Sequence, residues 1–333
     1  MPNANLVAST QSATKTMRAA VITGPGRSEI EHLTLPEPGA GEVRIRLEGS
    51  GVCGSNLPMW EGRPWFQYPA DAGSPGHEGW GMIDAVGEGV IGLSAGDRVA
   101  ALSYRAYAEY DIAAAEAVVP LPATLDGKFF PGEPLGCAVN IFRRTDIGPG
   151  QTVVIIGIGF LGAILTRLAT RAGARVIAIS RRPYALDLAR DFGAVLAVPL
   201  DDHHKIVGQI MQLTGGEGAD RVIEAVGAQW PLDLATDLTR IRGRLVIAGY
   251  HQDGPRQVNM QLWNWRGLDV INAHERDPQV YVEGIRGAVE AVSSGVLNPA
   301  RLYTHTFHLD QLPHAFELMR ERPDGFLKAL VLT

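Results

Sequence analysis

The sequence contains very little cysteine, since only Cys53 and Cys137 occur among its 333 residues. Two cysteines cannot form the framework of disulfides that stabilises small secreted domains. Isolated cysteines in a reducing compartment are commonly buried, bound to metal or catalytic. The cysteine content therefore favours a reducing environment and makes these two thiols candidate functional groups.

The sequence also lacks long hydrophobic runs and an excess of positive charge. No apolar run approaches the roughly 20 residues that a membrane-spanning helix needs, and residues 1–16 lack the apolar core of a secretion signal. The formal net charge is −6 and no long basic run occurs, which argues against nucleic acid or an anionic membrane as partner. We therefore expect a cytoplasmic protein that acts on a small molecule.

The chain is long enough for two domains, because 333 residues is about twice the length of a typical domain. Residues 1–16 show no periodicity, and we expect a disordered tail there. From residue 17 to about 119, short β-type runs alternate with Gly and Pro turns, which predicts an irregular, mostly antiparallel β domain. After residue 150, strand-like and helix-like stretches alternate, which predicts an α/β domain with a doubly wound parallel sheet.

The elements expected in the second half follow from hydrophobic periodicity. Strands are predicted at residues 152–156, 175–180, 221–225, 244–248 and 327–332, with an extended segment at 304–307 and an edge strand at 268–272. Helices are predicted from the glycine-rich turn to residue 171 and at 183–192, 232–240, 280–293 and 312–319. His203 and His204 are expected in a surface turn, and neither they nor the pair His305 and His308 suggest a second metal site.

A glycine-rich motif directly follows the first predicted strand of the second half. Its sequence is Gly157-Ile158-Gly159-Phe160-Leu161-Gly162, and it opens a predicted helix. Glycines at this spacing permit a tight turn and a close approach of the backbone to a pyrophosphate, and the helix N-terminus supplies N–H donors. Flavoproteins and some methyltransferases carry similar turns, but the flanking strand and helix favour a dinucleotide site.

The choice of dinucleotide should be decided at the end of the next predicted strand. An NAD site places Asp or Glu there to bind the ribose 2′-hydroxyl. This chain has Ser180, Arg181 and Arg182 instead, so no carboxylate repels a 2′-phosphate and guanidinium donors are at hand to bind one. The sequence therefore favours NADP(H), the alternative being a solvated arginine pair with Ser180 capping the following helix.

Several short motifs precede the nucleotide fold in a fixed order. They are Gly51-Val52-Cys53-Gly54-Ser55, Gly76-His77-Glu78-Gly79-Trp80-Gly81, Gly96-Asp97-Arg98-Val99 and Glu133-Pro134-Leu135-Gly136-Cys137-Ala138. Each is modest alone, but the ordered set resembles the zinc-containing medium-chain dehydrogenase/reductases from about residue 17 to residue 333.

This resemblance implies a domain organisation. A GroES-like catalytic domain would span residues 17–139, a Rossmann domain for NADP(H) would span 140–281, and residues 282–333 would return to the catalytic domain, with the active site in the cleft between the domains. Members are dimers or tetramers, which implies a homo-oligomer here. The four-cysteine loop that holds a structural zinc in many relatives is missing, so we expect at most one zinc per subunit.

A catalytic zinc needs three protein ligands and an open position at which an alcohol oxygen can bind and become more acidic. The resemblance implies Cys53 and His77 as two of them. For the third, Cys137 stands where alcohol dehydrogenases of the family place a cysteine, Glu133 stands where polyol dehydrogenases place a glutamate, and Glu78 is a further candidate. Because a thiolate is a strong, charge-neutralising ligand, we prefer Cys137 and expect both carboxylates nearby.

The resemblance also implies a route for the alcohol proton. Ser55 stands where family members keep a hydroxyl that carries this proton away, while the hydride passes to the nicotinamide. The Asp that usually follows is Asn56, and a His found further along the relay is replaced by Pro58. We therefore expect proton exit through the cofactor ribose or water, and Asn56 could still orient His77 by a hydrogen bond.

A dense aromatic group lies between the two predicted zinc ligands, and within it Trp60 is our best candidate to line the substrate pocket. Such a pocket would suit a ring-shaped or sugar-like alcohol. The alternative is that these aromatic residues fill the core of a small β domain, which is where most aromatic residues lie.

Two other functions stay open at this point. A zinc-free, NADPH-dependent quinone or enone reductase could share this fold, but the intact set of Cys53, His77 and Glu78 argues against it. A non-catalytic NADPH-binding sensor or structural subunit is allowed by Asn56 and Pro58 in the relay.

Overall fold

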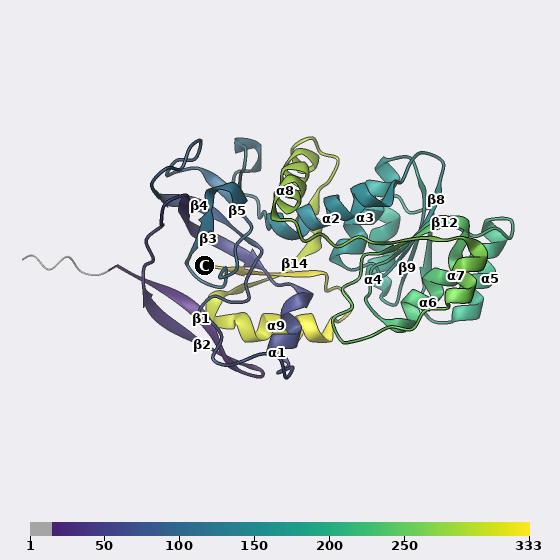
Figure 1. Cartoon of the computed structure of the whole chain (residues 1–333), viewed down its shortest axis with the longest axis horizontal. Helices are drawn as coiled ribbons and strands as arrows, with labels where there is room; N and C mark the ends of the chain where they lie inside the picture. Colours follow the sequence, from purple (N-terminus) through teal and green to yellow (C-terminus); the bar gives the residue numbers. More distant parts are fainter. Residues whose placement is uncertain (1–14) are drawn as a thin grey trace, which may run out of the picture.

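The computed structural model describes residues 15–333, so most of the predicted tail, residues 1–14, lies outside the described residues. The predicted α/β class is confirmed, and the two domains lie side by side along the long axis of the molecule (Figure 1). The first strand, β1, already begins at Thr16. No helix in this part of the chain is both long and apolar enough to cross a membrane.

The first domain, on the left of Figure 1, is built around an irregular β-sheet. Its strand order is β14-β15-β3-β4-β5-β7, with β6 paired to β3, and β1 and β2 form a separate antiparallel hairpin. The bounds are β1 Thr16–Gly24, β2 Arg27–Thr34, β3 Glu42–Gly51, β4 Gly79–Val86, β5 Arg98–Ala101, β6 Tyr110–Ala114, β7 Val118–Pro120, β14 Tyr303–His308 and β15 Lys328–Leu332.

The chain's last strand is an interior strand of this sheet. β15 pairs in parallel with β14 and in antiparallel with β3, where Leu330 lies opposite Gly51. Helix α9, Leu312–Glu321, buries Phe316 and Met319 in the core of the same domain. Residues 303–332 therefore complete the first domain although they follow the second in sequence.

The second domain is a six-stranded parallel sheet of order β10-β9-β8-β11-β12-β13. Alternate residues of the central strand β8, Thr152–Ile156, face opposite sides: Val153 and Ile155 pack in one hydrophobic cluster, Val154 and Ile156 in another. Each buried Val or Ile contributes about 1.5–3 kcal/mol relative to an exposed one, which fixes the register of the strand. The other bounds are β9 Arg175–Ser180, β10 Leu196–Pro199, β11 Ala219–Glu224, β12 Thr239–Ile247 and β13 Asp269–Asn272.

Helices cover both faces of this parallel sheet. One pair packs on the face of Val153 and the other on the face of Val154. The first pair is α3 Phe160–Arg171 and α4 Pro183–Asp191, and the second is α5 His203–Leu213 and α6 Gln229–Leu238.

The sequence missed or misplaced some of these elements. His203 and His204 open helix α5 rather than lying in a turn, and Asp202 caps that helix by accepting a hydrogen bond from the backbone N–H of Lys205. Helix α7, Met260–Arg266, was not predicted, because it buries none of its residues and so shows no periodic pattern. Strand β12 starts at Thr239, five residues before the predicted start, because its pairing with β11 is irregular up to Arg244.

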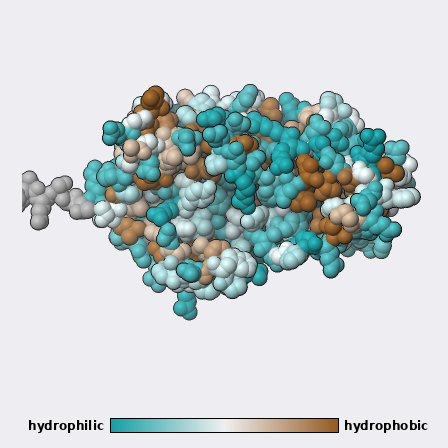
Figure 2. Space-filling model, viewed as in Figure 1, coloured by the Kyte–Doolittle hydropathy of each residue, from teal (hydrophilic) through white to brown (hydrophobic). Residues whose placement is uncertain are grey.

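The predicted edge strand is present, since β13 lies at the end of the parallel sheet with β12 on one side. Figure 2 shows hydrophobic residues gathered over the second domain, on the right of the molecule. The segment that leads into β13 exposes Val258, Met260 and Trp265.

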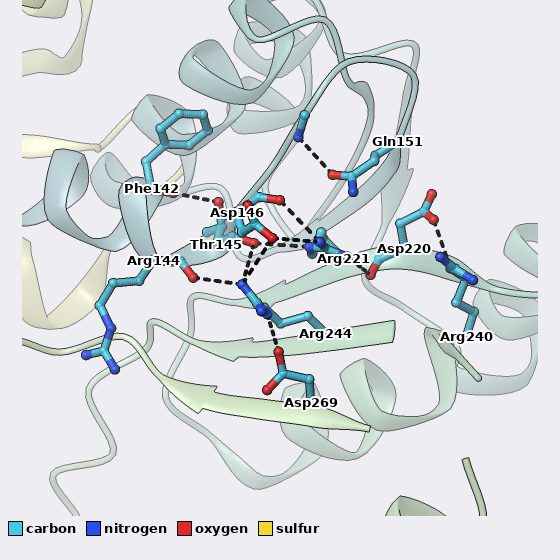
Figure 3. A network of polar contacts seen from close by, with 11 residues as sticks. Phe142, Arg144, Thr145, Asp146, Gln151, Asp220, Arg221, Arg240, Arg244 and Asp269 are labelled. Atoms are coloured by element: carbon cyan, nitrogen blue, oxygen red, sulfur yellow. Dashed lines mark hydrogen bonds and ion pairs between the residues drawn. The ribbon is translucent and has the colours of Figure 1, made fainter. Parts of the chain in front are cut away.

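Helix α2, Gly132–Thr145, carries the chain from the first domain to the second and packs along α8, Pro278–Ser293. Its C-terminal carbonyls are bound by arginines of the parallel sheet (Figure 3). Arg221 donates to the carbonyl oxygens of Thr145 and Asp146 at 3.0 and 3.2 Å, and Arg244 donates to that of Thr145 at 3.4 Å. Guanidinium groups at a helix C-terminus satisfy its free carbonyls and complement its dipole. The end of α2 is therefore anchored to the second domain.

Candidate metal and dinucleotide site

Three metal-binding side chains converge beyond the ends of two paired strands of the first domain. Cys53 follows β3, while His77 and Glu78 precede β4. One ligand atom from each of the three lies within 4.8 Å of the others. A thiol, an imidazole and a carboxylate are the three kinds of side chain that bind Zn²⁺, and three protein ligands are typical of a catalytic site with an open position.

The charges of this site fit a cation. Burial alone would lower the pKa of His77, but Cys53, Glu133 and Glu78 raise it to about 10. The imidazole thus lies among groups that attract positive charge. The carboxylate oxygen Oε2 of Glu78 is fully buried, and among residues 15–333 it is ion-paired with Lys328 without a well-aligned hydrogen bond. Donor type, spacing and charge all suit zinc.

Glu78 is nevertheless paired with a buried lysine. The ammonium Nζ of Lys328, on β15, lies 2.6 Å from Oε1 and 2.5 Å from Oε2 of Glu78, and the two residues are 3% and 0% exposed. Gly51 makes room for this pair, because a β-carbon at that position would lie 1.8 Å from Glu78 Oε2. Lys328 also lies 5.0 Å from the centre of the Phe160 ring, at the start of α3.

Helix α2 brings two further candidate ligands towards the site. The pKa of Glu133 is raised to about 7, mainly by burial and partly offset by His77. Burial and the charges of Glu133, Cys53 and Glu78 raise the pKa of the Cys137 thiol well above its ordinary value. Cys137, the predicted third ligand, is not one of the three residues grouped at ligand spacing, where Glu78 stands instead.

A chain of hydrogen bonds orients His77. Its Nδ1 lies 2.9 Å from the carbonyl oxygen of Pro75, so Nδ1 carries the proton and Nε2 is free to bind a metal. The amide of Asn56 donates to the same carbonyl at 3.2 Å, and the Tyr107 hydroxyl donates to Asn56 Oδ1 at 2.7 Å. Asn56 lies 3.4 Å from His77 Nδ1, so it acts on His77 mainly through Pro75.

The predicted proton carrier, Ser55, and the predicted pocket residue, Trp60, lie in different surroundings. Ser55 lies in the 3₁₀ turn Gly54–Asn56 directly after Cys53 and is partly exposed. Trp60 ends helix α1, Leu57–Trp60, and is only 2% exposed. It stacks on Phe316 with a centroid distance of 4.9 Å and donates to Glu317 Oε1 at 2.7 Å. Trp60 therefore belongs to the core of the first domain, which is the alternative that the sequence left open.

The glycine-rich turn between β8 and α3 has the predicted form. A β-carbon at Gly162 would lie 2.0 Å from the carbonyl oxygen of Gly157, and one at Gly157 would lie 2.5 Å from a methyl group of Val226. Among residues 15–333, no atom beyond its chain neighbours lies within 4 Å of the same position at Gly159, so that glycine faces open space at the N-terminus of α3. Phe160 and Leu161 are the first two residues of the helix. The first and last glycines permit close packing, and the middle one leaves space where a diphosphate binds in such turns.

The three residues predicted to select the cofactor, Ser180, Arg181 and Arg182, differ in burial and hydrogen bonding at the end of β9. Ser180 is buried and its hydroxyl accepts from the backbone N–H of Arg182 at 3.4 Å. The Arg182 guanidinium donates to the carbonyl oxygens of Phe326 and, at 3.3 Å, of Ile158. Arg181 is exposed. Arg182 thus joins the glycine-rich turn to the C-terminal segment, and Arg181 is the freer donor of the two.

Sequence reasoning missed Lys328 and Tyr107. The signal for Lys328 was a single cation in the otherwise apolar segment Phe326–Val331, because a charge on a buried strand needs a partner. No signal in the sequence relates Tyr107 to Asn56, which lies 51 positions away and meets it only through the fold.

Comparisons with known proteins agree with this arrangement. Residues 39–123 match the model of the alcohol dehydrogenase GroES-like domain, and residues 161–288 match that of the zinc-binding dehydrogenases. An alcohol dehydrogenase from Moraxella sp. is 33% identical over 70% of this chain and 77% of its own length. A sorbitol dehydrogenase from Halalkalibacterium halodurans is 27% identical over 91% of this chain and 96% of its own.

Solved structures show the same fold. The NADP-bound structure of a candidate zinc-binding dehydrogenase from Sinorhizobium meliloti superimposes with a TM-score of 0.83 at 25% identity, over 96% of this chain and 100% of that one. The 2R,3R-butanediol dehydrogenase from Bacillus subtilis gives 0.82 at 24% identity, over 95% and 99%. With its ordered motifs, its two domains and these relatives, the chain belongs to the zinc-type medium-chain dehydrogenase/reductase superfamily.

Proposed function

We propose that this protein transfers a hydride between an alcohol or polyol and NADP(H) at a single zinc site. The observation that carries the proposal is the group formed by Cys53, His77 and Glu78, with ligand atoms within 4.8 Å of one another. The relatives whose names include alcohol, sorbitol and erythritol or threitol dehydrogenase support the substrate class. Zinc, when bound, would polarise the hydroxyl of the substrate.

The residues of the chain have separate tasks in this proposal. Alcohol oxidation removes a hydride from the carbinol carbon, which reduces the nicotinamide ring, and a proton from the hydroxyl group. Ser55 Oγ, two residues after Cys53, is the group proposed to receive that proton and pass it to water or to the cofactor ribose. Tyr107, Asn56 and Pro75 keep His77 in the tautomer whose Nε2 can bind metal.

The cofactor preference rests on Arg181. The end of β9 carries no carboxylate to repel a 2′-phosphate, and Arg181 is exposed there while Arg182 is engaged with backbone carbonyls. A planar guanidinium binds phosphate through two parallel hydrogen bonds. The NADP-bound S. meliloti structure supports this choice, although another neighbour of similar fold holds NADH.

The first test is the zinc content of protein purified without added metal, measured by native mass spectrometry. We expect one zinc per subunit in the wild type and none in Cys53→Ala. Glu78→Gln and Cys137→Ser then identify the third ligand, since the proposal expects Glu78→Gln to lower zinc occupancy more than Cys137→Ser. A wild type without metal would refute the zinc site.

Turnover assays separate the proposed function from the two alternatives. A dehydrogenase loses oxidation of polyols and cyclitols when zinc is chelated, and it should prefer NADP⁺ to NAD⁺. A zinc-free reductase would keep NADPH-dependent enone reduction after chelation. A sensor would bind NADPH and turn over none of these substrates.

We also infer that two copies associate through the exposed edge of β13. The edge strand has unpaired backbone groups on one side, and Val258, Met260 and Trp265 expose apolar surface on the segment that leads to it. Light scattering during gel filtration should show a dimer or tetramer. Replacing Asn272 in β13, whose backbone N–H points away from β12, by proline should yield a folded monomer, and a wild-type monomer would refute the inference.

A further inference from the structure

Helix α9 ends in an arginine with an unusual backbone conformation. Arg322 has φ +46°, in the left-handed region, and is one of three non-glycine residues with positive φ among residues 15–333. Such a conformation is unfavourable for a residue that carries a β-carbon. The backbone N–H of Arg322 donates to the carbonyl oxygen of Leu318, and its Nε donates to that of Met319 at 3.1 Å.

The guanidinium of Arg322 points to the junction of the metal and dinucleotide sites. A β-carbon built on Gly54, the residue after Cys53, would lie 3.1 Å from Arg322 Nη2. Arg322 also lies close enough to Arg181 and Arg182 for their positive charges to repel one another. Burial and the charge of Arg181 lower the pKa of Arg322, whereas Cys53 raises it. Burial and the charge of Arg322 in turn lower the pKa of Arg182. Arg322 therefore lies between the predicted zinc ligand and the predicted 2′-phosphate donor.

No carboxylate of residues 15–333 forms an ion pair at 4.0 Å or less with this group of arginines, although the charge of Asp324 acts on Arg182 and opposes the lowering of its pKa. Arg182 donates to Ile158, so the group borders the glycine-rich turn, where Gly159 faces open space. Three mutually repelling cations around an open backbone turn are suited to a ligand that carries several negative charges.

A nicotinamide dinucleotide carries its charge at two places, the diphosphate and, in NADP(H), the ribose 2′-phosphate. Because Arg182 is engaged with the carbonyls of Ile158 and Phe326, two guanidinium groups are left for two anionic groups. Arg181 follows the end of β9, where Rossmann domains bind the ribose, whereas Arg322 lies beside Gly54, the residue after Cys53. We propose that Arg322 binds the cofactor diphosphate, reaching it from the first domain through the space that Gly54 leaves open; this proposal rests on the proposed function.

The test compares affinities for NADPH, NADH and ADP-ribose in the metal-loaded protein, measured by isothermal titration calorimetry. All three ligands contain the diphosphate, and only NADPH contains the 2′-phosphate. Since a charge-assisted hydrogen bond contributes about 1.5–3 kcal/mol, Arg322→Ala should weaken all three by a similar factor of roughly 10 to 100. Arg181→Ala should weaken NADPH alone. Arg322→Lys should recover part of the affinity, because it keeps the charge without the planar pair of donors.

Matched variants guard against indirect effects. Arg320→Ala, in the last turn of the same helix and exposed, should leave all three affinities unchanged. Gly54→Ala keeps Arg322 but fills the space beside it, so it should also weaken ADP-ribose; it serves as the second variant if Arg322→Ala fails to fold.

The outcomes separate the two proposals. If Arg322→Ala leaves the three affinities unchanged and raises only the KM of an anionic substrate, Arg322 binds substrate and the inference is wrong. The inference is also wrong if Arg322→Ala weakens NADPH but not NADH, since the lost contact would then be to the 2′-phosphate. If the wild type binds none of the three ligands, the proposed function itself fails.

Discussion

Replacing Lys328 by methionine should destabilise the metal-free protein strongly, because it leaves Glu78 as an unpaired buried charge. Glu78 is 0% exposed and both of its oxygens lie within 2.6 Å of the lysine ammonium. Removing one partner of a buried ion pair typically costs about 3–5 kcal/mol. Thermal unfolding of chelator-treated protein at pH 7 measures this loss, with an expected fall in Tm on the order of 5–10 °C for Lys328→Met.

Two further variants make the reasoning refutable. Glu78→Gln combined with Lys328→Met removes both charges, so it should be more stable than Lys328→Met alone by at least about 1 kcal/mol. Lys205→Met breaks an exposed pair with Asp201 and should cost under about 0.5 kcal/mol. A loss in Lys328→Met no larger than in Lys205→Met, or a double variant less stable than the single one, would show that the pair is not the source of stability we describe.

Three more outcomes follow from particular contacts. Trp60→Phe should lower the free energy of unfolding by about 1 kcal/mol, because the hydrogen bond to Glu317 is lost. It should leave the KM for every alcohol unchanged, and a selective rise in KM would show that Trp60 lines the substrate pocket. Tyr107→Phe removes the donor to Asn56 and should weaken zinc binding roughly tenfold in a competition with a chromogenic chelator, whereas unchanged affinity would exclude the proposed chain to His77. Gly159→Val should abolish NADPH binding without lowering Tm, because its β-carbon enters open space. Gly162→Ala should lower Tm instead, because its β-carbon meets the Gly157 carbonyl. Calorimetry measures the binding and thermal unfolding measures Tm, and equal effects of the two variants would contradict the distinction.

The sequence predicted the parallel sheet well where burial leaves a periodic pattern. The strands 152–156 and 175–180 were placed to the residue, because each has an apolar stretch, residues 153–156 and 176–179, bounded by polar or glycine residues. Helix α7 could not be predicted, since it lies on the surface and buries none of its residues. Local patterns report burial, and elements that bury little give no such signal.

The candidate site was predictable in its residue types and not in its pairings. Cys53, His77 and Glu78 stand in ordered motifs, and the structure brings them together. Whether Glu78 or Cys137 approaches the other two depends on where α2 lies relative to β3 and β4, which no local pattern encodes. Long-range contacts of this kind, such as Glu78 with Lys328 across 250 positions, follow from the topology alone.

The position of β15 between β14 and β3 has a consequence for biosynthesis. A ribosome releases the segment that builds the parallel sheet, residues 152–272, before it makes residues 303–332. The second domain can therefore fold while the chain is still growing, but the edge of β3 that receives β15 stays unpaired until residues 328–332 have been made. During that interval a nascent chain exposes a strand edge and leaves Glu78 without its Lys328 partner. Ribosome stalling before residue 328 should thus leave a product with a folded Rossmann domain that aggregates through its catalytic domain.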